Sequence, residues 1–493
     1  MRRAIIALFA VLLLGATPAP PDRAAKRSPV LAEAMDRTLR SGKLHAWVFF
    51  ADKGERAEAR AAAALVPMTP RAASRRRLRG QVRGASIEDL PLVTAYVDKV
   101  AAGVSRVRQQ SRWLNAVSVE ATAGQLAALE ALPFVARLDV VRGYRRRDDE
   151  RVDPDSGVQS RQPVRKPAVA VLDYGTSLGQ LAQIGVPPVH EMGFHGEGVV
   201  VAIFDAGFNS LNHEVFSSLR IVAAHDFVNG DDDVGDGADQ GDGSHGTETL
   251  SVLAGFQQGQ LIGPAFAADF ILAKTENTAS ETPVEEDNWA AAAEWAESLG
   301  ADVISSSLGY LDYDSPFPSY TFRDMNGQTA ISTRAAEMAA ARGVVVVNSA
   351  GNSGDDAQHN TLGAPADGAH VLAIAAVGAT GVRASFSSVG PSADGRIKPD
   401  LAAQGQGVRV ALPRSVSSYG TASGTSFSCP LTAGVVALLL QVNPTATPDD
   451  VAGVLRATAS QAGGPDKLLG WGIVNAHTAA NAWLPGGAAG AGR

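Results

Sequence analysis

Cysteine is nearly absent from this chain of 493 residues, which contains only Cys429. A single cysteine cannot form an intrachain disulfide, so the fold has to be held by packing and, where they bind, by metal ions. Cys429 stands in an apolar stretch, where a small apolar side chain is its simplest role. A disulfide-stapled fold is therefore excluded, while the length allows more than one domain and a large core.

Long apolar runs are also scarce. Residues 4–14 form one, directly after Arg2 and Arg3, and this run is too short to span a bilayer. A positively charged start, a short apolar core and small residues after it are typical of a secretory signal. We therefore expect a signal peptide over residues 1–19 and a secreted protein, extracellular or periplasmic. We expect no membrane partner, because no later stretch resembles a membrane helix.

Charge is not spread evenly along the chain. Residues 1–152 carry 27 Lys and Arg against 15 Asp and Glu, whereas residues 153–493 carry 16 against 36. A basic segment can indicate nucleic-acid binding, but no recognition motif accompanies this one. An acidic partner lies in the same chain, so we expect the two parts to attract each other and expect no nucleic-acid partner.

The basic part shows a regular order of strand and helix patterns. Strands are predicted over 44–50, 104–120 (one or two strands) and 134–141, and helices over 92–103 and 121–132. The order β-α-β-β-α-β predicts a small ferredoxin-like α+β domain over residues 20–142, with an unrelated accessory domain as the alternative. Residues 143–168 mix charge with Pro, Gly and Ser, and we expect them to be an exposed linker that is easily cut.

From residue 169 onward the pattern changes to apolar strands that alternate with helices. Strands are predicted at 199–204, 301–306 and 344–348, and helices at 285–299 and 329–342. This alternation predicts an α/β fold with an open, mostly parallel sheet, helices on both faces and functional groups at the carboxyl ends of the strands. We assign this domain to residues 169–484 and expect the Gly/Ala-rich residues 485–493 to be disordered.

Four polar residues stand at positions suited to chemistry, although each also has an ordinary explanation. Asp205 and Asn352 follow apolar strands in Gly-containing loops, where both are common turn residues. His245 lies between glycines, and a lone histidine is more often structural. Ser426 precedes an apolar helix and could simply cap it. A hydroxyl at the start of a buried helix nevertheless lies beside free N–H groups in a positive field, which suits a nucleophile whose attack creates an oxyanion.

The segments around these four residues resemble a known family when they are taken together. They are Asp205-Ala206-Gly207, Gly243-Ser244-His245-Gly246-Thr247, Ala350-Gly351-Asn352 and Gly424-Thr425-Ser426-Phe427-Ser428-Cys429-Pro430. In this order they resemble the motifs of the subtilisin-like serine peptidases over roughly residues 170–480, and the segment 111–142 resembles that family's propeptide. Ser244 is a mild departure, since the family usually has Thr before the histidine.

The resemblance implies a subtilisin-like fold and a serine endopeptidase. Ser426 would attack the scissile carbonyl, His245 would act as base and then acid, and Asp205 would orient the imidazole. Asn352 would donate to the oxyanion beside the backbone N–H of Ser426. The segment Ser307-Leu308-Gly309 would pair with an extended polypeptide substrate. The enzyme would need no cofactor for its chemistry, would have its own propeptide as a partner, and is expected to be a monomer.

Other enzyme classes fit less well. The order Asp…His…Ser differs from that of an α/β-hydrolase, where the serine comes first, and Ser428 stands where the nucleophile elbow would have its last glycine. An acid-acting relative would carry Glu and Asp at the positions of His245 and Asn352. The remaining alternative is an inactive relative that binds peptides or a partner, which predicts the loss of at least one catalytic residue; none is missing.

A loop rich in aspartate and glycine lies between the Asp205 and His245 segments. Within it, Asp231, Asp233 and Asp236 are candidate ligands of a structural calcium ion, because dense carboxylates on a loop supply the oxygen donors that calcium prefers. The loop lacks the terminal glutamate of an EF-hand, and a solvated acidic loop is the alternative.

Overall fold

The structure is a computed structural model. It describes residues 26–484 apart from 39–41, 58, 61–67, 142–149, 155–171, 236–243, 278–284 and 312–318. The predicted signal, the C-terminal tail and most of the predicted linker lie outside the described residues.

The N-terminal part, residues 20–142, which we call the leader, contains the predicted ferredoxin-like unit; we call the rest of the chain, from residue 169, the catalytic part. Its four strands are β1 (Lys43–Phe50), β2 (Arg106–Ser111), β3 (Ala116–Thr122) and β4 (Val135–Val140), and its helices are α1 (Pro29–Arg37), α4 (Thr94–Ala101) and α5 (Ala123–Glu130). The strands pair antiparallel in the order β2-β3-β1-β4. Alternate residues of β1 enter two different cores: Val48 packs under the leader's helices, while Trp47 faces the rest of the protein.

The sequence analysis missed one helix of the leader. Helix α3 (Pro70–Arg79) lies between β1 and α4, in a stretch that its arginines had marked only as polar. Thr69 caps it, since its hydroxyl accepts a hydrogen bond from the N–H of Ala72 at 3.2 Å, and Pro70 occupies the first helical position. Arg75, Arg76 and Arg79 of this helix are buried, which a polar surface segment would not show.

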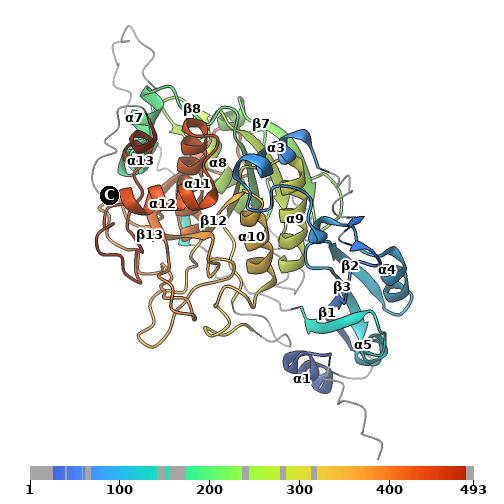
Figure 1. Cartoon of the computed structure of the whole chain (residues 1–493). Coiled ribbons are helices and arrows are strands. Elements are labelled where there is room, and N and C mark those ends of the chain that lie inside the picture. The colour runs from blue at the N-terminus through green and yellow to red at the C-terminus, as the bar shows by residue number, and fades with distance from the viewer. Residues whose placement is uncertain are drawn as a thin grey trace, which may run out of the picture.

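The larger part is built on a seven-stranded sheet whose strands all pair in parallel (Figure 1). In spatial order the strands are β14 (Leu401–Gln404), β13 (Val371–Val377), β12 (Val345–Ser349), β11 (Val303–Ser306), β6 (Val200–Asp205), β10 (Asp269–Lys274) and β7 (Arg220–Asp226). The central strands β6, β11, β12 and β13 are buried along their whole length because helices cover both faces.

Each face of this sheet has its own core. Val201 and Ile203 of β6 face α8 (His245–Ala254) and α11 (Thr425–Val442), whereas Ala202 and Phe204 face α9 (Glu285–Leu299) and α10 (Ile331–Ala341). The leader's sheet packs on α9 (Figure 1), and its apolar side chains belong to the same core as those of α9 and α10. The predicted fold class is therefore confirmed, including an N-terminal domain ahead of the parallel sheet.

Shorter elements complete the described chain. They are α6 (Leu178–Gln183), α7 (Val186–Glu191), α12 (Pro448–Thr458), α13 (Ala476–Trp483), β8 (Phe256–Gln257), β9 (Leu261–Ile262), β15 (Val408–Ala411), β16 (Tyr419–Ser423) and the 3₁₀ turns Ile87–Asp89, Gly175–Ser177 and Glu214–Phe216. Helix α11 is long and apolar enough to cross a membrane by length and composition, which the sequence analysis had not expected; 89% of it is buried inside the protein, as in a core helix.

Part of the predicted linker is a strand. Residues Glu150–Pro154 form β5, which pairs antiparallel with β16, the strand that leads into α11. The segment that we expected to be an exposed linker therefore contains a strand at these five residues. The pairing places a segment of this chain beside the strand that precedes Ser426.

Candidate active site

The candidate site residues gather at one edge of the parallel sheet. Asp205 is the last residue of β6, Ser307 directly follows β11, and Asn352 lies three residues after β12. Ser426 is in the first turn of α11. Carboxyl ends of adjacent parallel strands share one edge, so residues far apart in sequence meet there.

Asp205 and His245 are joined directly. The Nδ1 atom of His245 lies 2.6 Å from Oδ1 of Asp205, and Asp205 is fully buried. Since an ionised carboxylate only accepts, Nδ1 carries the proton of this bond and Nε2 of the neutral ring is left as an acceptor. On its far side the imidazole lies near the ring of Phe427, with centroids 5.9 Å apart. His245 is thus held between the aspartate and the residue after Ser426.

The Asp205 carboxylate has further donors. Its Oδ1 also accepts from the N–H of Ala206 at 2.7 Å, and its Oδ2 accepts from the hydroxyl of Thr249 at 2.9 Å. Three donors explain how a buried carboxylate is held in one orientation. The sequence analysis missed Thr249, although its spacing carries a signal, because a residue four positions after His245 lies one helical turn further on the same face of α8.

Ser426 does not cap its helix. Gly424 is the N-cap of α11, which places Ser426 at the second helical position. The backbone of Gly424 is extended, with φ 165°. Ser426 exchanges two hydrogen bonds with Ser307: its hydroxyl donates to the Ser307 carbonyl at 3.4 Å, and the Ser307 hydroxyl donates to the Ser426 carbonyl at 2.8 Å. These bonds fix the first turn of α11 against the end of β11.

Asn352 is oriented by the residue before Ser426. Its Oδ1 accepts from the backbone N–H of Thr425 at 2.9 Å and from the Thr425 hydroxyl at 2.8 Å. With Oδ1 turned toward Thr425, the amide nitrogen points to the other side of the group. Thr425 is a second residue that the sequence analysis missed as a positioning group.

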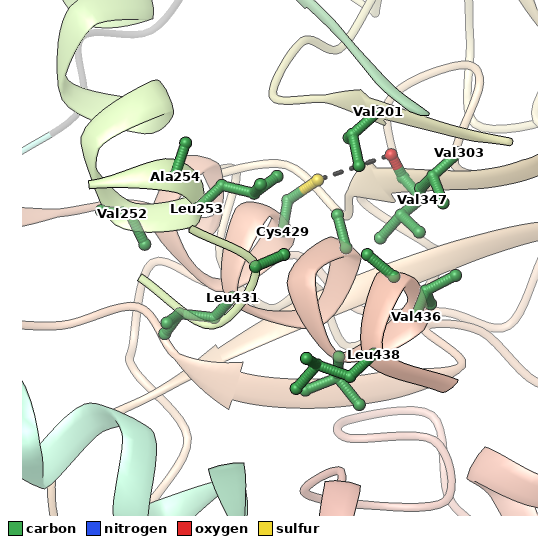
Figure 2. Close-up of a cluster of buried hydrophobic side chains, with 14 of the residues drawn as sticks. Val201, Val252, Leu253, Ala254, Val303, Val347, Cys429, Leu431, Val436 and Leu438 are labelled. Atoms are coloured by element: carbon green, nitrogen blue, oxygen red, sulfur yellow. Dashed lines mark hydrogen bonds between the residues drawn. The ribbon is translucent and has the colours of Figure 1, made fainter. Parts of the chain in front are cut away.

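Cys429 is packed as the sequence suggested. The side chain is fully buried among apolar residues such as Val201, Val303 and Val436 (Figure 2), and its Sγ lies 3.5 Å from the carbonyl oxygen of Val347. Burial raises the pKa of this thiol to about 12, so the nucleophilic thiolate is suppressed.

The calcium candidates are only partly described. Oδ1 of Asp231 accepts from the N–H of Asp233 at 3.0 Å, and Oδ1 of Asp233 accepts from the N–H of Gly235 at 3.1 Å, so both carboxylates stabilise turns. Asp236 lies outside the described residues. Among those that the structure does describe, no group of three or more His, Cys, Asp or Glu side chains could hold a metal ion. A calcium site stays a prediction.

An Asp–His pair and a helix-borne serine at the carboxyl edge of a parallel sheet define a class of α/β serine hydrolases. Within that class, the chain belongs to the subtilase family, whose model matches residues 196–472. A model of the peptidase S8 propeptide domain of Bacteroidota matches residues 45–154, which spans the leader's sheet and β5. The protein is accordingly a serine endopeptidase with an N-terminal propeptide, so the family and the enzyme class predicted from the sequence are confirmed.

Its relatives include well-known subtilisins. Subtilisin NAT of Bacillus subtilis subsp. natto is 31% identical over 302 residues, which is 61% of this chain and 70% of that protein. Subtilisin DY of Bacillus licheniformis is 31% identical over 306 residues, 61% of this chain and 99% of that protein.

Two solved structures are similar to this one. Fervidolysin from Fervidobacterium pennivorans, a keratinolytic enzyme related to subtilisin, matches with a TM-score of 0.62 and 23% identity over 91% of this chain and 63% of that chain, which shows the fold alone. A structure of proteases from Pseudoalteromonas arctica matches with a TM-score of 0.51 and 26% identity over 64% of this chain and all of that chain.

Proposed function

We propose that Asp205, His245 and Ser426 form the catalytic triad of this endopeptidase. The observation that carries the proposal is the buried Nδ1–Oδ1 contact of 2.6 Å between His245 and Asp205, beside the helix that bears Ser426. An inactive relative has no need to keep a buried imidazole tied to a buried carboxylate, because burying the charge is unfavourable without a function or a partner.

The proposed reaction is acyl transfer. The Oγ of Ser426 attacks the scissile carbonyl carbon while Nε2 of His245 takes its proton, and the Asp205 carboxylate stabilises the imidazolium that forms. The oxygen of the tetrahedral intermediate is held by the Asn352 amide and the Ser426 N–H. The C–N bond then breaks as His245 returns the proton to the leaving amine. Water, activated by the same imidazole, hydrolyses the acyl-enzyme and restores Ser426.

The substrate would lie along Ser307–Gly309. The carbonyl of Leu308 is fixed in place, since it accepts from the Asn348 amide at 2.8 Å. Tyr310, the residue after this segment, exchanges two backbone hydrogen bonds with Ala364, of 2.9 and 3.0 Å. A backbone fixed at this point offers an extended peptide a rigid edge to pair with. Pockets beside this edge would select the substrate side chains that the enzyme prefers at the cleavage site.

The leader would be the first substrate of the enzyme. Strand β5 follows the leader and pairs with β16, which ends three residues before Ser426. The antiparallel register runs from Pro154 opposite Gly420 to Glu150 opposite Ser423, so the N-terminal end of β5 lies beside the end of β16 that leads to Ser426. We propose that the protein is secreted as a precursor and that it cuts this segment itself.

A fluorophosphonate probe tests the triad. Processed wild-type enzyme should be labelled at one site and should hydrolyse a casein substrate, whereas Ser426→Ala should do neither. Ser428→Ala is the matched control: this serine lies one half-turn further along α11, and its buried hydroxyl only donates to the Thr425 carbonyl at 2.9 Å. Labelling of Ser426→Ala at the wild-type rate, or no labelling of processed wild type, would overturn the proposal.

A further inference from the structure

The leader contacts the catalytic part in two separate places. Its sheet lies along α9, where Ser118 donates to Asp287 and Ser111 donates to Glu294. A second segment, residues 69–90, which we call the arm, carries α3 and lies across the other ends of α9 and α10 (Figure 1). The arm reaches the residues that end both of these helices.

The arm satisfies the carbonyl groups that a helix leaves unpaired at its C-terminus. Around the end of α9, its groups donate to five consecutive carbonyls: Glu297 and Ala301 from Arg75, Ser298 and Leu299 from Thr69, and Gly300 from Arg71. At the end of α10, Val82 donates to Ala341 at 2.9 Å and Arg75 donates to Arg342 at 3.2 Å. Because the negative ends of two helix dipoles meet here, arginines are the favoured side chains.

The backbones also approach closely. Gly343, just after α10, has φ 87°, and a Cβ there would come within 2.9 Å of the Gly80 nitrogen in the arm. The contact therefore depends on a glycine in the catalytic part as well as on the arginines of the leader. A fit of backbone on backbone indicates a specific docking position for the arm.

Arg76 is the centre of a buried ionic network. Its Nε and Nη2 donate to the two carboxylate oxygens of Glu297 at 2.8 and 2.7 Å, and its Nη1 and Nη2 donate to the two oxygens of Asp89 at 2.7 and 3.1 Å. The side chains of Arg76, Glu297 and Asp89 are each at most 1% exposed. One guanidinium thus makes two bidentate pairs, one across the interface and one within the arm.

The catalytic part also contributes a cation, Arg342, to this network. Nε of Arg342 donates to Asp89 at 3.0 Å, and its guanidinium lies 4.7 Å from the ring centroid of Trp113 in the leader. A further carboxylate, Asp302, pairs with both Arg71 and Arg79. Ion pairs therefore cross the interface in both directions, which fixes the position of the arm more strictly than a general attraction between a basic and an acidic surface.

We propose that the arm is a dedicated anchor of the leader, which recognises the C-terminal ends of α9 and α10 independently of the leader's sheet and supplies a large share of its affinity for the catalytic part. Removing one member of a buried network leaves its partner charged, buried and uncompensated. Because these ion pairs cross the interface, this cost weakens the binding of the leader to the catalytic part. The anchor also resists salt, since charges buried from solvent are screened far less than exposed ones. The proposal rests on the proposed self-processing only in that the test uses a cut chain.

The test measures how readily the cut leader leaves the enzyme. Processed protein is diluted in steps, and gel filtration with intact mass of each peak gives the concentration at which the two fragments separate. For Arg76→Met we expect that concentration to rise at least about 100-fold. Arg77→Met is the matched control, because Arg77 neighbours Arg76 but is exposed, and it should behave as wild type. An unchanged midpoint for Arg76→Met would overturn the proposal.

Two further measurements cover the case in which Arg76→Met fails to fold. The double variant Arg76→Met/Glu297→Met removes both buried charges together and should bind the leader at least about tenfold better than the Glu297→Met single variant, which leaves two arginines facing each other. In unprocessed Ser426→Ala protein, the amides of Thr69 and Val82 should exchange hydrogen as slowly as those of β1. Rapid exchange in the arm beside a protected sheet would show that the arm is not an anchor, whatever cuts the chain.

Discussion

Gly246 lies against the carbonyl oxygen of Gly207 so closely that a Cβ on residue 246 would come within 2.2 Å of that oxygen. Residue 246 follows His245, and residue 207 lies two positions after Asp205. The glycine therefore allows α8 to start close enough to the end of β6 for the histidine to reach the aspartate.

This contact makes Gly246→Ala informative. The added methyl group must push the start of α8 away from Asp205, which lengthens the His245–Asp205 bond. We expect kcat/KM to fall by about 100-fold, the order of effect of a 1 Å misplacement in an active site. Gly124→Ala, in a leader helix where a Cβ would have only one neighbour, at 4.0 Å, should leave activity unchanged. Retention of more than a fifth of the wild-type kcat/KM by Gly246→Ala contradicts this account.

Thr249→Val tests how the aspartate is held. The substitution keeps the shape of the side chain but removes the hydroxyl that donates to Oδ2 of Asp205. Loss of this donor to the buried carboxylate should lower the free energy of unfolding by about 1–3 kcal/mol. The imidazole should also be less well oriented, which should lower kcat more than it raises KM. Thermal unfolding and steady-state kinetics measure the two effects. Thr249→Ser keeps the donor and should restore most of kcat; if it does not, the methyl group and not the hydroxyl matters.

Asn352→Asp separates the two roles assigned to this amide. An aspartate can still accept from the N–H and hydroxyl of Thr425, but it cannot donate to an oxyanion and brings a negative charge near it. We expect both Asn352→Asp and Asn352→Ala to lower kcat by about 10²–10³ with little change in KM; this magnitude is taken from the oxyanion-hole amide of subtilisin, a relative of this chain. A decrease of less than about fivefold would remove Asn352 from the oxyanion hole.

The sequence predicted elements best where one physical signal dominates. The bounds of α9 were predicted residue for residue, because the stretch is rich in the helix formers alanine and glutamate. The strand that ends at Asp205 was visible as a continuous apolar run. Helix α3 was missed because its buried residues are arginines, and burial of arginine depends on carboxylates such as Glu297 more than 200 positions away. No local pattern reports such a partner, just as none reports that Oδ1 of Asn352 turns toward Thr425.

Leader docking should weaken as the pH rises. Burial raises the pKa of Asp287 to about 7, against the opposing effects of Arg108 and the Ser118 hydroxyl, both from the leader's sheet, while Glu286 beside it raises the pKa further. The docked state therefore holds a proton that the free enzyme releases at its ordinary Asp pKa of about 4. Docking keeps its full strength below that value and loses it as the pH rises through about 7. Glu294, whose pKa is also raised by burial, acts in the same direction.

The dilution assay at pH 6.5 and pH 8.5 measures this effect. We expect the concentration at which the leader separates to be about fourfold higher at pH 8.5 than at pH 6.5. Asp287→Asn should remove most of that difference, since an amide still accepts from Ser118. His45 of the leader, whose pKa burial lowers to about 4, acts only below its ordinary pKa and does not enter this window. Equal docking at pH 6.5 and pH 8.5 would show that Asp287 is ionised in the complex as well as in the free enzyme.

The last prediction concerns where the chain is cut. Strand β5 runs antiparallel to β16, with an irregularity in the register between Thr421 and Ser423, and Glu150 lies opposite Ser423. Ser426 follows Ser423 by only three residues, in the first turn of α11, so among the described residues of β5 it is Glu150 whose partner stands nearest in sequence to the candidate nucleophile. We therefore expect a new N-terminus between residues 147 and 150 in wild-type protein, read by intact mass and N-terminal sequencing. Ser426→Ala, expressed in a host that lacks other secreted proteases, should accumulate as the uncut precursor, and Ser428→Ala should be cut as wild type. Equal cutting of Ser426→Ala and wild type would instead assign the cleavage to a separate protease, for which the run Arg145-Arg146-Arg147 is the suspect site.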